Sequence, residues 1–261
     1  MQSYIDQLGN TIELSDTPKR IVSLVPSQTE LLFDLGLNKE VVGITKFCVH
    51  PAEKVKGKKI VGGTKNFDLE KIASLKPDLI IANKEENYKE GIEALRARYP
   101  VWVSDINTLD DASEMIRHIG EITEKKREAV RLAKRIESSF RTLKRSNRLN
   151  TAYFIWKDPY MSIGSDTFIH HIMTRAGFKN VFADRTRYPI VTAEQLKKAA
   201  PELILLSSEP YPFSEKHLEE FKAICPNAEL LLVDGELFSW HGSRLQHSVA
   251  YLQSLQQLLL A

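Results

Sequence analysis

The sequence predicts an α/β protein made of two similar lobes, each with a mostly parallel sheet, joined by one long α-helix. The first observation is an internal repeat, in which residues 68–81 return in similar form as residues 192–205. Each copy has a capping residue, a helix that stops before a proline, and then a short aliphatic strand. The second observation is the alternation of strand and helix patterns in both halves, which is typical of parallel sheets. Two lobes create a cleft, and clefts between domains are where small ligands usually bind.

The composition is that of an ordinary soluble globular protein. The 261 residues are 43% hydrophobic and 27% charged, and they suffice for one large domain or two of usual size. The net charge of +2 gives no field that would attract nucleic acid or an anionic membrane. The longest apolar runs, such as residues 203–206, are too short to span a bilayer. We therefore expect no nucleic-acid partner and no membrane insertion.

The N-terminus and the cysteines bear on the compartment. Residues 1–6 lack the basic start and apolar stretch of a secretion signal, so either the protein is cytoplasmic or a leader preceded Met1. The two cysteines, Cys48 and Cys225, fall in opposite predicted lobes, where a disulfide would lock a cleft. We expect both to be reduced.

The N-terminal lobe is expected to cover residues 1–108. It opens with a hairpin that turns at Gly9 and Asn10. A helix then follows the first buried strand; Ser27 and Glu30 form its expected capping box, and Gly36 ends it. The strands are expected at residues 20–25, 41–44, 79–82 and 101–103, with loops at residues 45–50, 62–67 and 83–88. Loops at the carboxyl ends of parallel strands are where ligands bind.

Residues 109–148 are expected to connect the lobes. Residues 109–122 form one helix, and Thr123 caps a longer one with apolar side chains along one face. From Glu124 to about Asn147 this helix would span roughly 36 Å at 1.5 Å per residue. Its many charged residues are those of a solvated face.

The C-terminal lobe is expected to cover residues 149–261. Its first helix, residues 166–176, ends at Gly177 in the way that the earlier helix ends at Gly36. Thr192 caps the second repeat helix, and residues 243–260 form the last helix. The strands are expected at residues 151–156, 203–206 and 230–233, with loops at residues 157–160, 185–191 and 234–243.

These stretches resemble the substrate-binding proteins of ABC importers for metal chelates. The signature segments are residues 20–27, 70–81 and 194–205, and the resemblance runs from about residue 4 to the C-terminus. It implies two Rossmann-like lobes with central, mostly parallel sheets, joined by one long rigid α-helix that permits little closure. It also implies a monomeric binding protein and no enzyme, and the sequence contains no phosphate loop, dinucleotide fingerprint or Gly-x-Ser-x-Gly elbow.

Residues 47–51 and 239–244 most resemble the cobalamin-binding branch of that family. The resemblance implies no catalytic cofactor, and a corrinoid (cobalamin) or another metal chelate as the transported ligand. A ferric-siderophore or haem receptor of the same fold is an alternative, and so is a cytoplasmic corrinoid-binding protein without a permease. The family favours a periplasmic or cell-surface location if a leader preceded Met1, and a cytoplasmic one applies if Met1 is the native start.

Glu70 and Glu194 occupy equivalent places near the starts of the two repeat helices. Complementing the helix dipole there is worth about 0.3–1 kcal/mol. The resemblance implies another role, because in this family one glutamate on each lobe pairs with arginines of the ABC permease. We favour docking.

The ligand-binding candidates are aromatic and polar side chains on the expected strand-end loops, because a corrin is broad, flat and partly apolar. They are Phe47, His50, Asn66, Phe67, Asn83, Trp156, Tyr160, Tyr188, Phe238, Trp240 and Arg244. The resemblance implies ligand contact for the loops of Trp156 and Tyr188, whereas Asn66 and Asn83 stand where the cobalamin binders have tryptophans. Core packing is the commoner fate of an aromatic residue, and it is expected for Trp102 inside a strand.

Two candidates have further alternatives. His50 and Cys48 are too few to form a zinc site, so no direct metal site is expected. An alternative hypothesis makes His50 an axial ligand to the cobalt of a corrinoid. Arg244 either binds a propionamide, phosphate or carboxylate edge of the ligand or pairs with Asp234 or Glu236. His170 and His171 are expected on a helix surface away from the strand ends.

Overall fold

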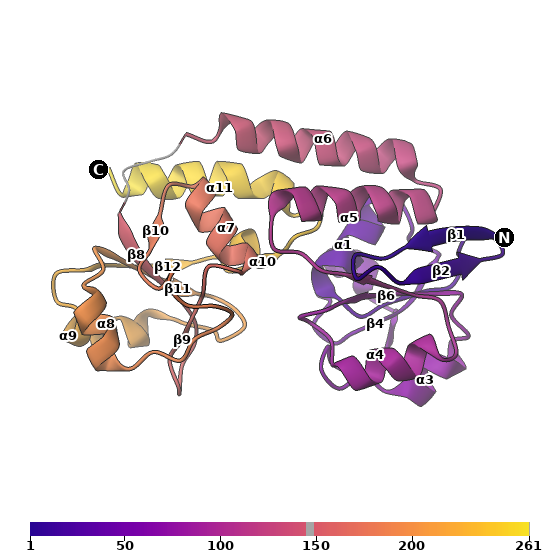
Figure 1. Ribbon diagram of the computed structural model, residues 1–261, viewed down its shortest axis with the longest axis horizontal. Helices are drawn as coiled ribbons and strands as arrows, with labels where there is room; N and C mark the ends of the chain where they lie inside the picture. The colour runs from indigo at the N-terminus through magenta and orange to yellow at the C-terminus, as the bar shows by residue number, and fades with distance from the viewer. Residues whose placement is uncertain (145–148, 261) are drawn as a thin grey trace. The chain divides into compact units, whose positions relative to one another are not determined.

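The structure, a computed structural model, describes residues 1–144 and 149–260, which form two compact units (Figure 1). Unit 1 comprises Met1–Ile106, Asp110–Ile136 and His241–Arg244, and unit 2 comprises the described residues of Asn107–Leu109, Glu137–Trp240 and Leu245–Ala261. The chain passes from unit 1 to unit 2 within helix α6 (Lys126–Thr142). The last four residues of the predicted connecting segment 109–148 lie outside the described residues.

Unit 1 is built on a five-stranded parallel sheet with the order β5-β4-β3-β6-β7. The strands are β3 (Ile21–Ser23), β4 (Val41–Ile44), β5 (Lys59–Ile60), β6 (Leu79–Asn83) and β7 (Val101–Ser104). The helices are α1 (Pro26–Asp34), α2 (Ala52–Val55), α3 (Leu69–Ser74), α4 (Lys89–Arg96) and α5 (Leu109–Ile122). Helices α3 and α4 lie on one side of this sheet and α5 lies on the other (Figure 1). Aliphatic side chains such as Val22, Ile72 and Ile80 fill the layer between the sheet and helices α3 and α4.

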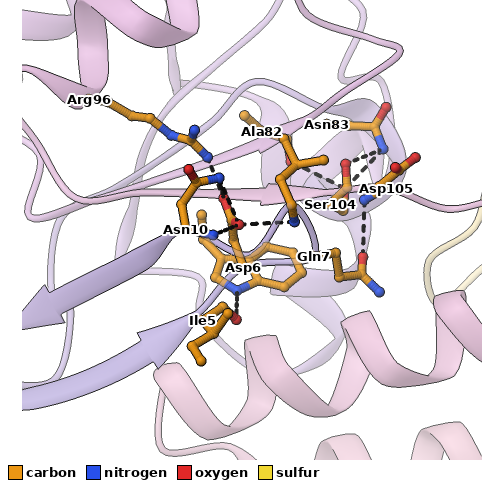
Figure 2. A network of polar contacts seen from close by, with 11 residues as sticks. Ile5, Asp6, Gln7, Asn10, Ala82, Asn83, Arg96, Ser104 and Asp105 are labelled. Atoms are coloured by element: carbon orange, nitrogen blue, oxygen red, sulfur yellow. Dashed lines mark hydrogen bonds and ion pairs between the residues drawn. The ribbon is translucent and has the colours of Figure 1, made fainter.

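An N-terminal hairpin covers the edge strand β7. Its strands are β1 (Gln2–Ile5) and β2 (Thr11–Leu14). The indole Nε1 of Trp102 donates to the carbonyl of Ile5 at 3.3 Å (Figure 2). The N–H of Gln7 donates to the carbonyl of Val103 at 3.1 Å. Every residue of β7 is buried, and Val101 and Val103 also belong to the core of unit 1.

The turn of this hairpin is closed by a buried carboxylate, that of Asp6. The carboxylate accepts hydrogen bonds from the backbone N–H of Asn10 and from the Asn10 side chain, and it pairs with the guanidinium of Arg96 (Figure 2). Gly9 takes the left-handed conformation at φ +82°, as the predicted Gly-Asn turn requires. The hairpin is thereby tied to α4 as well as to β7.

Unit 2 is built on a second parallel sheet, with the order β10-β8-β11-β12 and the short β9 antiparallel to β8. The strands are β8 (Asn150–Trp156), β9 (Met161–Ser162), β10 (Lys179–Asn180), β11 (Leu203–Ser207) and β12 (Glu229–Val233). The helices are α7 (Phe168–Arg175), α8 (Ala193–Ala199), the 3₁₀ turn η1 (Glu215–His217), α9 (Leu218–Ile224), α10 (Glu236–Ser239) and α11 (Leu245–Leu258). Helices α8 and α9 lie on one side of this sheet, and α7 and α11 lie on the other (Figure 1). The predicted α/β class with mostly parallel sheets is confirmed.

The predicted repeat is visible in local geometry. The side chains of Asp68 and Thr192 each accept hydrogen bonds from backbone N–H groups in the first turns of α3 and α8. Both copies also reach their proline through a left-handed residue, Lys76 at φ 47° and Ala200 at φ 42°. This agrees with the steric exclusion of the right-handed helical region just before proline.

The predicted capping box of α1 is wrong. Helix α1 has Val25 as its N-cap, with no side-chain cap, and Pro26 in the first turn. Proline fixes the helical φ angle without a side-chain cap. The carboxylate of Glu30 bonds instead to the guanidinium of Arg244.

Two predicted element ends also shift. The hydroxyl of Thr123 donates back to the carbonyl of Ile119 at 2.6 Å instead of capping the next helix, which begins at Lys126. Strand β6 extends one residue further than predicted and so includes Asn83. Asn83 therefore lies within the sheet and not on the loop where it was predicted.

Candidate functional site

The loops at the carboxyl ends of the unit 1 strands expose two apolar side chains. Phe47 is 50% exposed and Val49 is 47% exposed, both on the loop after β4. The exposed Asn66 lies on the loop before α3, and both it and the Phe47 ring approach Gly63 closely. A Cβ atom on Gly63 would lie 2.3 Å from Asn66 Oδ1 and 3.3 Å from the Phe47 ring, so glycine permits this arrangement.

Asn83 is buried, and its hydrogen-bonding capacity is used within the protein. Its Oδ1 accepts from the backbone N–H groups of Glu85 at 2.9 Å and Glu86 at 3.0 Å. Its Nδ2 donates to the hydroxyl of Ser104 at 2.9 Å and to the carbonyl of the same residue at 3.3 Å (Figure 2). An amide side chain has two N–H donors and one acceptor oxygen, so these bonds use all three within the protein. The predicted ligand contact of Asn83 stays a prediction.

Asn87, which the sequence reasoning missed, ties three strand-end segments together. Its Oδ1 accepts from the N–H of Asn83 at 2.9 Å. Its Nδ2 donates to the carbonyls of Leu24 at 3.2 Å and Thr64 at 3.0 Å. The signal in the sequence is an asparagine four residues after the end of a strand, close enough to bond back to the N–H of the last strand residue.

Three predicted ligand-binding aromatics pack inside their units. Phe67 lies against Tyr88 in the unit 1 core, with ring centroids 4.6 Å apart. Phe238 is fully buried, and Trp240 is buried with its Nε1 donating to a carboxylate of Glu209 at 3.0 Å. The loop position of these rings suggested exposure, but core packing takes up most of their surface.

Unit 2 exposes large apolar side chains at the end of β8 and on the loop between β10 and α8. Trp156, the last residue of β8, is 39% exposed and meets the Tyr211 ring edge-on at 5.7 Å between centroids. Ile190 is 59% exposed and forms an isolated β-bridge with Met161. The sequence reasoning missed Ile190 and Val49, although each stands two residues after a predicted aromatic.

The other two aromatic residues of unit 2 that were predicted to bind the ligand, Tyr160 and Tyr188, are half-buried. The hydroxyl of Tyr160 donates to the carboxylate of Glu220, which also pairs with Lys157. Burial, followed by this carboxylate, raises the pKa of Tyr160, which therefore stays neutral. Tyr188 lies under the guanidinium of Arg187, 5.8 Å from the ring centroid.

Arg244 belongs to a short segment, residues 241–244, that unit 1 contains. Its Nε and Nη2 donate to the two carboxylate oxygens of Glu30 at 2.9 and 2.7 Å, which is neither of the predicted ion pairs. A Cβ on Gly242 would lie 2.3 Å from the carbonyl oxygen of Ser27, so the segment runs tightly against α1. Burial raises the pKa of Glu30 despite the hydrogen bonds from Arg244. The forked pair orients the guanidinium of Arg244, and its predicted contact with the ligand stays a prediction.

In the part of the chain that the structure describes, the cysteines and histidines form no recognisable metal centre. Within residues 1–144 and 149–260, no three His, Cys, Asp or Glu side chains converge as metal ligands would. Cys48 is buried against the hydroxyls of Thr29 at 3.1 Å and Thr45 at 3.3 Å, and burial raises the pKa of its thiol. Both cysteines are free thiols, and His50 is half-buried on the loop after β4.

Glu70 and Glu194 are each the second residue of their helix, α3 in unit 1 and α8 in unit 2, and both are exposed. A hydrogen bond from the hydroxyl of Thr192 lowers the pKa of Glu194, so this carboxylate is ionised at neutral pH. Among the described helices, none has both the length and the apolar character needed to cross a membrane. Glu70 and Glu194 thus occupy equivalent and accessible positions in the two units.

Comparison with known families identifies the type of protein. The family model described as periplasmic binding protein matches residues 21–223. The chain belongs to this family. It is therefore a binding protein and not an enzyme. The uncharacterized ABC transporter substrate-binding lipoprotein YvrC of Bacillus subtilis is 30% identical to it over 215 residues. The match covers 77% of this chain and 68% of that relative. The vitamin B12-binding protein of Pectobacterium carotovorum is 26% identical over 236 residues, 87% of this chain and 84% of that relative.

A solved structure shows the same fold. This periplasmic binding protein matches the periplasmic heme binding protein HutB of Vibrio cholerae with a TM-score of 0.79 at 21% identity. The match covers 94% of this chain and 100% of that one. The two-lobe fold that the resemblance implied is therefore confirmed, whereas proteins that share it bind different chelates.

Proposed function

We propose that this protein is the ligand-binding receptor for a corrinoid, with cobalamin as the first candidate, and that it feeds an ABC importer. The observation that carries the proposal is the exposure of large apolar side chains on strand-end loops of each sheet. Phe47 and Val49 supply them in unit 1, and Trp156 and Ile190 supply them in unit 2. Exposed apolar clusters at such loops are typical of ligand sites, and a corrin offers matching broad faces. The likeness to a vitamin B12-binding protein supports the same ligand class.

A haem or ferric-siderophore receptor is the second candidate. Haem is also flat and apolar, and HutB shows that this fold serves a haem binder. One polar feature bears on this choice, a half-buried carboxylate at the unit 2 edge.

We propose that Glu70 and Glu194 dock the protein onto arginines of its permease. Their equivalent positions, exposure and charge support this role. We also propose an extracytoplasmic location, supported by the lipoprotein relative. A cytoplasmic corrinoid-binding protein without a permease is the competing proposal, and it predicts no effect of these glutamates on uptake.

The deciding experiment is a calorimetric titration with cyanocobalamin, followed in parallel by tryptophan fluorescence. Trp102 and Trp240 are buried, so Trp156 is the tryptophan whose quenching would report a ligand at the unit 2 edge. We expect one-to-one binding with quenching that is largely lost in Trp156→Phe. Absence of both heat and quenching would refute the corrinoid proposal, and hemin and a ferric siderophore would then be titrated in the same way.

A further inference from the structure

A carboxylate that the sequence reasoning missed lies at the carboxyl edge of the unit 2 sheet. Glu209 follows the end of β11 by two residues and is half-buried. Its Oε1 accepts from the hydroxyl of Ser239 at 2.6 Å and from Nε1 of Trp240 at 3.0 Å. Both donors come from the segment after β12, so the carboxylate is held between two neighbouring strand-end segments.

The backbone beneath this carboxylate is also fixed. The hydroxyl of Tyr153 donates to Oγ of Ser207 at 3.1 Å, and that hydroxyl donates to the carbonyl of Glu209 at 2.6 Å. A Cβ on Gly235 would lie 2.2 Å from Ser207 Oγ and 2.7 Å from Glu209 Cγ, so the segment after β12 packs directly on this residue. The side chain is preorganised from both sides.

The second carboxylate oxygen, Oε2, is left for an outside partner. Among the described residues no hydrogen bond reaches it, and it is not one of the fully enclosed polar atoms. Burial raises the pKa of Glu209, the neighbouring carboxylates of Glu236 and Asp234 raise it further, and the two hydrogen bonds oppose them. A hydrogen-bond donor on the ligand relieves this unfavourable charge, whereas a second carboxylate adds to it.

We propose that Glu209 is a specificity-determining residue, whose Oε2 accepts a hydrogen bond from an N–H or O–H group on the edge of the ligand and disfavours a ligand carboxylate. This inference rests on the proposed function, because it requires a chelate at the strand-end loops. The chemistry favours a ligand rimmed by neutral primary amides, as corrinoids are, over one rimmed by propionates, as haem is. It thereby separates the two candidates that share this fold.

The test compares cyanocobalamin with hemin, titrated separately into the wild-type protein and two variants. Glu209→Gln keeps an acceptor oxygen for Ser239 and Trp240 but removes the charge. Glu219→Gln is the control, because it removes the same charge from an exposed position on α9. We expect Glu209→Gln to reduce the preference for cyanocobalamin over hemin by about tenfold, the range of a hydrogen bond to a charged group. The control should leave the preference unchanged.

A second variant guards against loss of folding. Ser239→Ala keeps the carboxylate and removes one of the groups that orient it, so the preference should fall in the same direction by about twofold to threefold. A preference unchanged in both variants would overturn the role of Glu209, and so would a wild-type protein that binds hemin more tightly. Binding of neither chelate by the wild type would instead refute the proposed function and the inference with it.

Discussion

The strand-end loops of the two units differ although the backbones beneath them repeat. At the unit 1 edge two buried asparagines, Asn83 and Asn87, bond to neighbouring protein groups, while Phe47 and Val49 are exposed. In unit 2 the edge carries an exposed tryptophan, Trp156, and a half-buried carboxylate, Glu209. The repeat therefore accounts for the equivalent positions of the loops, whereas the side chains that they carry differ.

The edge strands differ in the same way. The unit 1 edge strand β7 is wholly buried under the N-terminal hairpin (Figure 2). The corresponding edge strand of unit 2, β12, keeps exposed and half-buried residues along most of its length. The edge of the unit 1 sheet is thus more fully packed than that of unit 2. Substitutions at the unit 1 edge should therefore lower the free energy of unfolding more than those at the unit 2 edge.

The largest expected effect tests what the units have in common. Replacing both Glu70 and Glu194 by alanine should reduce ligand uptake to background, because both carboxylates of the proposed docking pair are lost. Each single variant should cause a comparable partial loss, since the positions are equivalent. Uptake in cells that carry the cognate permease measures this, and calorimetry should show unchanged affinity. Normal uptake by the double variant would exclude docking through these residues.

The next effect tests the bracing of unit 1. Asn87→Ala leaves one buried N–H and two carbonyls without their partner, which should lower the free energy of unfolding by about 3 kcal/mol. Urea unfolding measures this difference. Asn66→Ala is the matched control, because that side chain is exposed and its loss should cost less than about 0.5 kcal/mol. Equal effects of the two variants would show that the clamp adds no stability.

A smaller effect tests the division of ligand contacts. Trp156→Ala should weaken cyanocobalamin binding by about 2 kcal/mol, or about thirtyfold, because it removes the largest exposed ring of unit 2. Phe47→Ala should cost about 1 kcal/mol, because the phenyl ring offers less surface. Neither should change the unfolding free energy by more than about 0.5 kcal/mol. A greater loss of affinity in Phe47→Ala would place the main ligand contact on unit 1.

Patterns that act over a few residues were predictable from the sequence. The helix caps Asp68 and Thr192 are confirmed because a cap bonds to N–H groups within its own turn. The partner of Glu30 was not predictable, because Arg244 lies 214 positions away and only the folded chain brings the two together. The same holds for Asn83, because its bonds to Ser104 cross to the neighbouring strand, 21 positions away. Fold class follows from periodicity, whereas the fate of a loop side chain depends on long-range packing.

The smallest effect concerns pH and the carboxylate that distinguishes unit 2. The pKa of Glu209 is raised in the folded protein by burial and by the neighbouring Glu236 and Asp234. An acid with a raised pKa stabilises the fold below its unfolded pKa and loses that contribution as the pH rises through the folded value. Glu209→Gln, which stays neutral, should therefore melt at a higher temperature than wild type at pH 8. The gain should shrink toward pH 5, as thermal melts across that range would show. A gain that is constant with pH, or one shared by Glu219→Gln, would mean that the Glu209 charge is not the cause.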